Sequence, residues 1–152
     1  MVDRLDAEQR SRLMARIKSR GNYSTELKLV ALLRKERIFG WRRQVKLPGT
    51  PDFVFKKERI CVFVHGCFWH GCVRCKKQSL SHRGYWREKI DANRQRDRRV
   101  ARELRRRGYA VIIVWECSLR GSRAASVLGR ISRTIAFRTK SADNLKYLKM
   151  RA

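Results

Sequence analysis

Acidic residues are scarce in this chain, in which 13 Asp and Glu residues face 39 Lys and Arg residues over 152 positions. The formal net charge of +26 exceeds what solubility needs, and a chain of this charge repels itself unless a polyanion is its usual partner. Nucleic acid is the polyanion that such a charge predicts. No single basic amphipathic helix dominates the sequence, which disfavours a membrane-surface protein. Charge alone does not distinguish an enzyme from a structural protein of the ribosomal kind.

Long apolar runs are also missing, so no segment reaches the roughly 20 residues that a membrane-spanning helix needs. Residues 1–4 carry no apolar segment of the kind that begins a signal peptide, and we therefore expect a cytoplasmic protein. Hydrophobic residues make up 43% of the chain, enough for one domain with its own core. We expect this domain over residues 1–138, with a basic arm at 1–20, followed by a basic, mobile tail at 139–152.

Cysteine and histidine gather in the fifteen residues from Cys61 to Cys75, which hold four of the five cysteines and two of the three histidines. Cys72 and Cys75 have the spacing of half a zinc site, and Cys67 and Cys117 are further candidate ligands. Cys61 falls within a strand pattern and is interpreted as a small core residue. Cysteines in a chain without a secretory signal favour a metal over disulfides. The alternative is a set of reduced core cysteines.

Apolar periodicity predicts an α/β fold. Helices are expected over residues 6–19, 24–37, 85–107 and 122–137, and strands over 41–47, 52–55, 60–65 and 109–115. The run at 109–115 is almost continuously apolar, which predicts a central strand. The basic helix at 6–19 either lies along a phosphate backbone or is simply solvated. Residues 76–84 are expected to form a loop that carries His82 at the surface.

Several polar residues fall at positions that suggest a site. Glu26 projects toward the apolar face of its helix, where a carboxylate needs an ionic partner or a metal, unless it only favours the helix N-terminus. Asp52 follows a proline at the start of a strand, as in the Pro-Asp…(Asp/Glu)-x-Lys nucleases, although Asp is also an ordinary turn residue there. Asn93 and Asp97 share a helix face with Trp86, which suggests a cleft or a hydrogen bond across the core.

Five motifs stand in a fixed order within residues 8–121. They are T-E at 25–26, P-G-T-P-D at 48–52, H-G-C-F-W-H at 65–70, W-R-E-K-I at 86–90 with Asn93 and Asp97 beyond it, and V-W-E-C at 114–117. Together they resemble the very-short-patch repair (Vsr) endonucleases, and the H-G-C-F-W-H string is the most specific of them. The last thirty residues lie outside the resemblance.

The resemblance implies a restriction-endonuclease-like α/β fold of the PD-(D/E)xK type, with a central mixed sheet flanked by helices and a structural Zn²⁺ site. It implies an endodeoxyribonuclease that uses Mg²⁺ and nicks duplex DNA on the 5′ side of the T in a T·G mismatch. Such mismatches arise when 5-methylcytosine deaminates, and the nick starts very-short-patch DNA repair. It further implies an enzyme that acts on the nucleoid of a prokaryote, with repair-pathway proteins as candidate partners. We expect a monomer, since one asymmetric lesion needs one active site. The alternatives are a related metal-dependent restriction or defence nuclease without mismatch specificity, and a zinc-stabilised nucleic-acid binder without enzymatic activity.

The resemblance also assigns roles to residues. Catalytic roles fall on Glu26, Asp52, His65 and His70. Mg²⁺ would bind Asp52 and the backbone carbonyl of Val64, a position where typical members carry Thr. The second carboxylate and the lysine of general restriction enzymes are absent at residues 63–65, as in this family.

Zinc ligation is implied for four cysteines, because Cys72 replaces a family histidine and one residue is inserted before Cys75. The complete set is Cys67, Cys72, Cys75 and Cys117. DNA contacts are implied for Met14, Phe68, Trp69, Trp86, Lys89 and Asn93. Spacing alone would instead place at least one of the adjacent aromatics Phe68 and Trp69 in the core. If these two aromatic rings insert between base pairs, they favour a mismatch, because a T·G wobble pair is unstacked at a lower free-energy cost than a Watson–Crick pair.

Phosphodiester hydrolysis needs an activated water, neutralised phosphate charge and a proton for the leaving oxygen. Mg²⁺ on Asp52 would meet the first two needs, and imidazole suits proton transfer near neutral pH. We expect His70 to be the general base, held by Glu26, and His65 to contact the scissile phosphate or the leaving oxygen. The sequence does not decide which histidine has which role. The alternative is that one or both histidines bind zinc.

Overall fold

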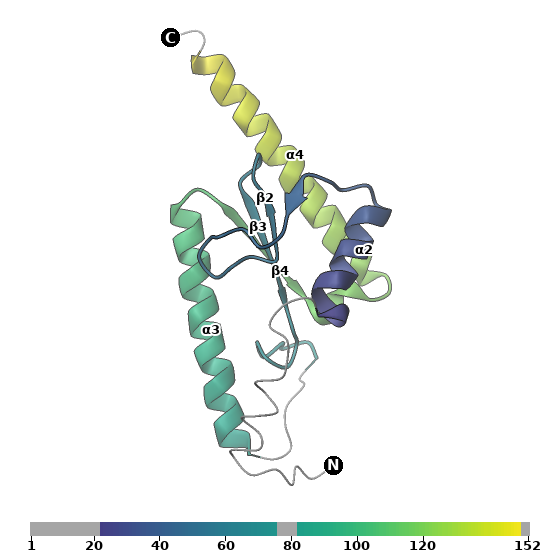
Figure 1. The fold of residues 1–152 in the computed structure, drawn as a ribbon, viewed down its shortest axis with the longest axis vertical. Coiled ribbons are helices and arrows are strands. Elements are labelled where there is room, and N and C mark those ends of the chain that lie inside the picture. The colour runs from purple at the N-terminus through teal and green to yellow at the C-terminus, as the bar shows by residue number, and fades with distance from the viewer. Residues whose placement is uncertain (1–21, 76–81, 150–152) are drawn as a thin grey trace.

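A computed structural model describes residues 22–75 and 82–149 of the chain, with side chains described as far as residue 141 (Figure 1). The expected helix at 6–19, with Met14, lies outside the described residues. The strands are β1 (Trp41–Arg42), β2 (Phe53–Phe55), β3 (Ile60–His65) and β4 (Ala110–Trp115). The helical segments are η1 (Tyr23–Leu27, a π-turn), α2 (Lys28–Lys35), α3 (Arg83–Arg106), η2 (Glu116–Leu119, a 3₁₀-turn) and α4 (Arg123–Lys149).

The strands form one mixed sheet in the order β1-β2-β3-β4, which confirms the expected α/β class. β1, β2 and β3 pair antiparallel, with a ten-residue loop between β1 and β2 and a short turn between β2 and β3. β3 and β4 pair parallel, with Cys61 opposite Val111 and His65 opposite Trp115. α3 provides the crossover that a parallel pair requires. The ends of β3 and β4 therefore lie side by side, and the residues that follow them, including Cys67 and Cys117, meet at one end of the sheet.

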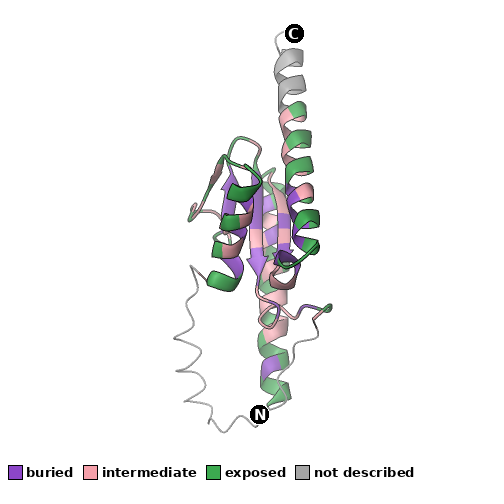
Figure 2. Ribbon diagram, turned by 90° about the vertical axis from the view of Figure 1, so that its right-hand side faces the viewer, coloured by how far each residue is buried: buried purple, intermediate pink, exposed green. Residues whose placement is uncertain are grey.

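Helices cover both faces of the sheet. α2 and α4 pack on one face and α3 on the other (Figure 1). The larger core lies under α2 and α4, where Leu29, Leu33, Phe53, Val62 and Ile131 are almost fully buried. A smaller core of Val54, Cys61 and Leu104 lies under α3. Strand side chains alternate between the two faces of the sheet, and helices cover both faces. All residues of β2 and all but one residue of β3 are therefore buried (Figure 2).

The expectation that residues 109–115 form a central strand is wrong for the described sheet, in which β4 is the edge strand. Its run is apolar because it has helices on both faces, and not because strands flank both its edges. Ile112 and Val114 are buried in the larger core, while Val111 and Ile113 line a cavity on the other face. Nη2 of Arg130, on α4, donates to the carbonyl of Ile113 at 2.5 Å, which covers part of the free edge.

Other elements differ from expectation mainly at their ends. The strand expected over 41–47 has only two residues, because Gln44 adopts a positive φ of 57° and a turn follows. The first helical turn begins at Tyr23, before the expected Ser24 or Thr25. α3 agrees with expectation to within two residues. α4 extends to Lys149, so the expected tail is helical through that residue, and its mobility in solution stays a prediction.

No helix within residues 22–75 and 82–149 is both long enough and apolar enough to cross a bilayer.

Candidate active site

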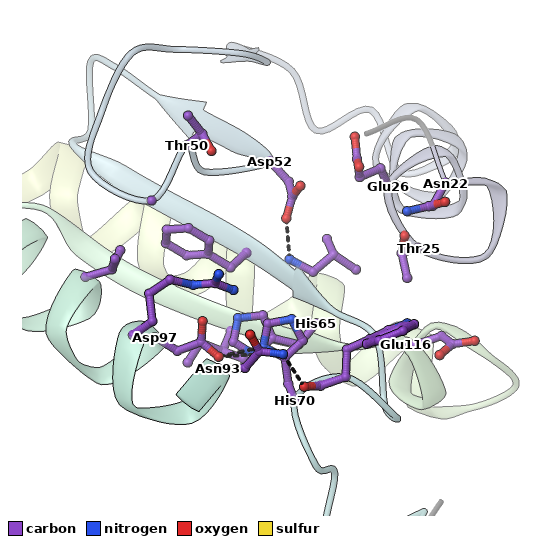
Figure 3. Close-up of a pocket in the computed structure, with 18 of the residues that line it drawn as sticks. Asn22, Thr25, Glu26, Thr50, Asp52, His65, His70, Asn93, Asp97 and Glu116 are labelled. Atoms are coloured by element: carbon purple, nitrogen blue, oxygen red, sulfur yellow. Dashed lines mark hydrogen bonds and ion pairs between the residues drawn. The ribbon is translucent and has the colours of Figure 1, made fainter. Parts of the chain in front are cut away.

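A cavity of about 850 Å³ opens between η1, the end of β3 and the middle of α3 (Figure 3). It is lined by all four residues predicted to be catalytic: Glu26, Asp52, His65 and His70. Glu26 and Asp52 lie on one side of the cavity, and the two histidines lie on the other side with Asp97 of α3 (Figure 3). Four segments that are distant in sequence therefore bring acidic and imidazole groups to one place.

Asp52 immediately precedes β2 and points toward the neighbouring strand β3. Its Oδ2 accepts a hydrogen bond from the backbone amide of Val64 at 2.6 Å. Burial raises the pKa of Asp52 to about 6, against the opposing effect of this hydrogen bond; the charge of Glu26 adds to the rise and that of Arg43 reduces it. The raised pKa means that the positive charges around Asp52 do not offset the cost of burying its ionised carboxylate. This environment, and the hard oxygen ligands at Asp52 and Val64, fit a divalent cation such as Mg²⁺.

His65 and His70 stack face to face, with ring centroids 3.9 Å apart and planes inclined by 12°. Nδ1 of His70 lies 2.5 Å from Oδ2 of Asp97, and Nδ1 of His65 lies 3.9 Å from the same oxygen. Burial, followed by the charge of His70, lowers the pKa of His65 to about 4, so that His65 is neutral at physiological pH. Burial alone would raise the pKa of Asp97, but the hydrogen bond with His70 and the charges of both histidines lower it below its ordinary value.

The expectation that Glu26 holds His70 is wrong, because the partner of His70 is Asp97. Glu26 forms an ion pair with Arg43 instead. Sequence reasoning placed Asp97 on the inner face of its helix and predicted a cleft or a hydrogen bond there, but it assigned Asp97 no catalytic role. The sequence feature that could have identified this role is the position of Asp97 four residues after Asn93, on the helix face that carries Trp86.

His65, His70 and Asp97 bring one potential ligand atom each to within 4.8 Å of one another. A metal ion bound by an imidazole lies close to the plane of the ring. Two stacked rings with nearly parallel planes cannot both meet that condition for a single ion. As arranged, the three side chains are suited to holding and moving a proton, which is the chemistry that a histidine hydrogen-bonded to a carboxylate supplies.

The four predicted cysteine ligands converge on one point beside the histidine loop. The Sγ atoms of Cys67, Cys72, Cys75 and Cys117 all lie within 4.8 Å of one another, with 3.6 Å between Cys67 and Cys75 and 3.8 Å between Cys72 and Cys117. A tetrahedral site with Zn–S bonds of 2.3 Å has S···S edges of about 3.8 Å. The cluster therefore has the dimensions of a four-thiolate metal site, and neither cavity histidine belongs to it. Cys61 is separate and fully buried in the core, as expected.

α3 fastens the loop that joins the cysteine cluster to the cavity. Asn93 donates to the carbonyl of Trp69 at 2.8 Å, and Nη2 of Arg94 donates to the carbonyl of Gly71 at 2.6 Å. Gly71 has a φ of +63°, and a Cβ there would lie 2.6 Å from the Arg94 guanidinium and 2.7 Å from Ile90. Only glycine fits this approach without displacement. Arg94 is a second supporting residue that the sequence did not single out.

The predicted DNA wedge residues pack against one another at the entrance of this loop. Phe68 contacts Trp86 edge-on with 4.9 Å between ring centroids, and Trp69 lies 5.8 Å from Trp86. Trp86 is buried, whereas Phe68 and Trp69 are only half-buried. The ammonium of Lys89 lies 5.7 Å from the ring centroid of the exposed Tyr85. Phe68 and Trp69 thus pack against Trp86 with part of their ring surface, and the rest of that surface is accessible to a partner.

A basic α/β protein that gathers a buried aspartate, two histidines and a four-cysteine cluster around one open cavity has the parts of a hydrolytic nuclease. The comparison with known proteins gives the same class. The family model described as DNA mismatch endonuclease Vsr matches residues 2–77, which is half of the chain.

Three relatives are similar over most of their length. A type II nicking enzyme of Xanthomonas oryzae pv. oryzae, V.XorIIP, is 43% identical over 123 residues, covering 78% of this chain and 88% of that protein. The DNA mismatch endonuclease Vsr of Escherichia coli K12 is 40% identical over 123 residues, covering 80% and 78%. A type II nicking enzyme of Neisseria meningitidis, V.NmeAIP, is 38% identical over 126 residues, covering 79% and 86%. The chain belongs to the Vsr family of DNA mismatch endonucleases, and it is an endodeoxyribonuclease.

Proposed function

We propose that this endonuclease nicks duplex DNA on the 5′ side of the T in a T·G mismatch and so starts very-short-patch repair of deaminated 5-methylcytosine. The observation that carries the proposal is the meeting of Asp52, His65 and His70 in one cavity, in a member of a family named for mismatch cleavage. The names of two relatives, both type II nicking enzymes, support cleavage of a single strand. We further propose a monomer that acts in the cytoplasm, since one lesion needs one site.

Asp52 and the backbone carbonyl of Val64 would hold Mg²⁺. When bound, this ion supplies an activated water and neutralises charge on the phosphate. Asp52 suits this role because it is a buried carboxylate that a cation would stabilise. Val64 suits it because its amide already positions the Asp52 carboxylate, and the backbone can do this whatever side chain stands there. Glu26 adds a second carboxylate to the same side of the cavity.

His70 is the proposed general base. Its Nδ1 is engaged by Asp97, which orients the ring and leaves Nε2 as the nitrogen that exchanges a proton with the reacting water. His65 contacts the scissile phosphate or the leaving oxygen. Because the pKa of His65 is lowered to about 4, this residue is neutral when it does so and offers a hydrogen bond rather than a full charge.

The cysteine cluster would hold structural Zn²⁺ and support the loop that carries Phe68, Trp69 and His70. Glu116 ties this cluster to the cavity, since its Oε2 accepts from the amide of Cys67 at 3.2 Å and its side chain lines the cavity. DNA contacts are proposed for Phe68, Trp69, Trp86, Lys89 and Asn93, and for Met14 of the N-terminal arm. The half-buried rings would enter the base stack next to the mismatch, where unstacking costs least.

A nicking assay tests the proposal. End-labelled duplexes carrying T·G or T·A in several sequence contexts are incubated with Mg²⁺ and either the natural protein or Asp52→Ala. We expect cleavage of only the T-containing strand, only at T·G, and a loss of about 10³-fold or more in rate in the variant, as is usual when a catalytic metal ligand is removed. Equal cutting of both duplexes would leave a nuclease without mismatch specificity. Tight binding without any cutting would contradict the proposed catalytic roles.

A further inference from the structure

A partly buried arginine lies behind the acidic side of the cavity. Nη2 of Arg43, directly after β1, pairs with Oε2 of Glu26, and the two side chains are only 26% and 7% exposed. Charges shielded from water to this degree interact much more strongly than charges at the surface. Glu26 lines the cavity, whereas Arg43 is not among the described residues that do so. The guanidinium thus pairs with a carboxylate of the cavity without lining the cavity itself.

The charge of Arg43 also reaches Asp52. Its guanidinium carbon lies 5.9 Å from the ring centroid of Phe53, the residue that follows Asp52. Glu26, the partner of Arg43, lines the same side of the cavity as Asp52 (Figure 3). Nε of Arg43 is buried and has no hydrogen-bond acceptor among the described residues, whereas Nη2 of the same guanidinium is paired with Glu26. Arg43, Glu26 and Asp52 therefore form one interacting group.

We propose that Arg43 is a built-in counter-cation, which competes with the catalytic divalent ion for the negative charge of Glu26 and Asp52 and so sets how tightly that ion binds. The inference rests on the proposed function, in which Asp52 holds Mg²⁺. With Arg43 in place, an arriving ion meets two carboxylates and one guanidinium. Without Arg43 it meets the same two carboxylates with one positive charge fewer beside them. Arg43 lies outside the cavity, so its effect is on ion affinity and not on direct contact with the scissile phosphate.

Direct Mn²⁺ binding measures this effect without relying on nicking. The protein is first saturated with Zn²⁺ at its cysteine cluster, and free Mn²⁺ is then followed by electron paramagnetic resonance in the absence of DNA. The test variant is Arg43→Gln, and the matched control is Arg42→Gln, which removes the same charge from the exposed neighbouring residue. We expect Arg43→Gln to bind Mn²⁺ about tenfold more tightly than Arg42→Gln, because the removed charge acts through a shielded environment.

Two further variants complete the experiment. Arg43→Lys keeps the charge and is expected to bind Mn²⁺ as weakly as the natural protein, which shows that the result does not come from local unfolding. Equal affinity in Arg43→Gln and Arg42→Gln, or weaker binding in Arg43→Gln, would overturn the inference. Asp52→Asn is expected to abolish binding. If it does so while Arg43→Gln fails to tighten binding, the role of Arg43 alone is refuted; if Asp52→Asn binds Mn²⁺ normally, the proposed metal site itself is refuted.

Discussion

At the scale of single residues, burial of the Asp52 carboxylate lowers the stability of the folded protein at neutral pH. Its pKa is raised from 3.8 to about 6 by burial, so folding favours the protonated form. The stability that this protonation provides is complete below the unfolded pKa and is lost as pH rises from about 4 through about 6, which amounts to about 2 to 3 kcal/mol. We therefore predict that Asp52→Asn raises the melting temperature of the cation-free protein at pH 7.5 but not at pH 4.

Thermal melts of both proteins, with and without Mg²⁺, check this prediction. Mg²⁺ should stabilise the natural protein and leave Asp52→Asn unaffected. Asp91→Asn is the control, because Asp91 lies on α3 with its side chain 50% exposed. If Asp52→Asn has the same melting temperature as the natural protein at pH 7.5, the ionised carboxylate does not destabilise the folded protein.

At the scale of elements, α3 supports the loop that carries His70, the proposed general base. Arg94 donates to the carbonyls of Gly71 and His70, at 2.6 and 3.4 Å, so one side chain links α3 to the segment between the cysteine cluster and the cavity. We predict that Arg94→Ala slows single-turnover nicking about tenfold while costing only about 1 kcal/mol of stability, the usual value of such hydrogen bonds. Release of Zn²⁺ to a chelator should also become faster. Arg98→Ala, an exposed position one turn later, is the control, and equal behaviour of the two variants would remove the supporting role.

At the scale of the whole molecule, the charge extends well beyond the cavity. α4 projects past the sheet at the end of the molecule opposite the first turn of α3 (Figure 1), and Ile135 is its last described residue packed on the core. Removal of residues 142–152 deletes three cations and one acidic residue but no described core contact. We predict an unchanged melting temperature and a salt dependence of DNA binding that is shallower by up to about 2.7, since each of the three lost cations lowers the slope by about 0.9 when it contacts a phosphate. Binding titrations at several salt concentrations measure it, and an unchanged slope would show that this end of α4 does not contact DNA.

Much of this architecture was readable from local pattern. Strand β3, helix α3, the buried Cys61 and the four clustered cysteines follow from periodicity and spacing, because backbone hydrogen bonding and ligand geometry repeat over a few residues. The motifs likewise identified Asp52, His65 and His70 as neighbours in the site. Tertiary structure alone decided that β4 lies at an edge of the described sheet, that His70 pairs with Asp97, and that Glu26 pairs with Arg43. These partners are 27 and 17 residues apart, and which charges meet depends on how helices pack across a sheet, a property that no local spacing encodes.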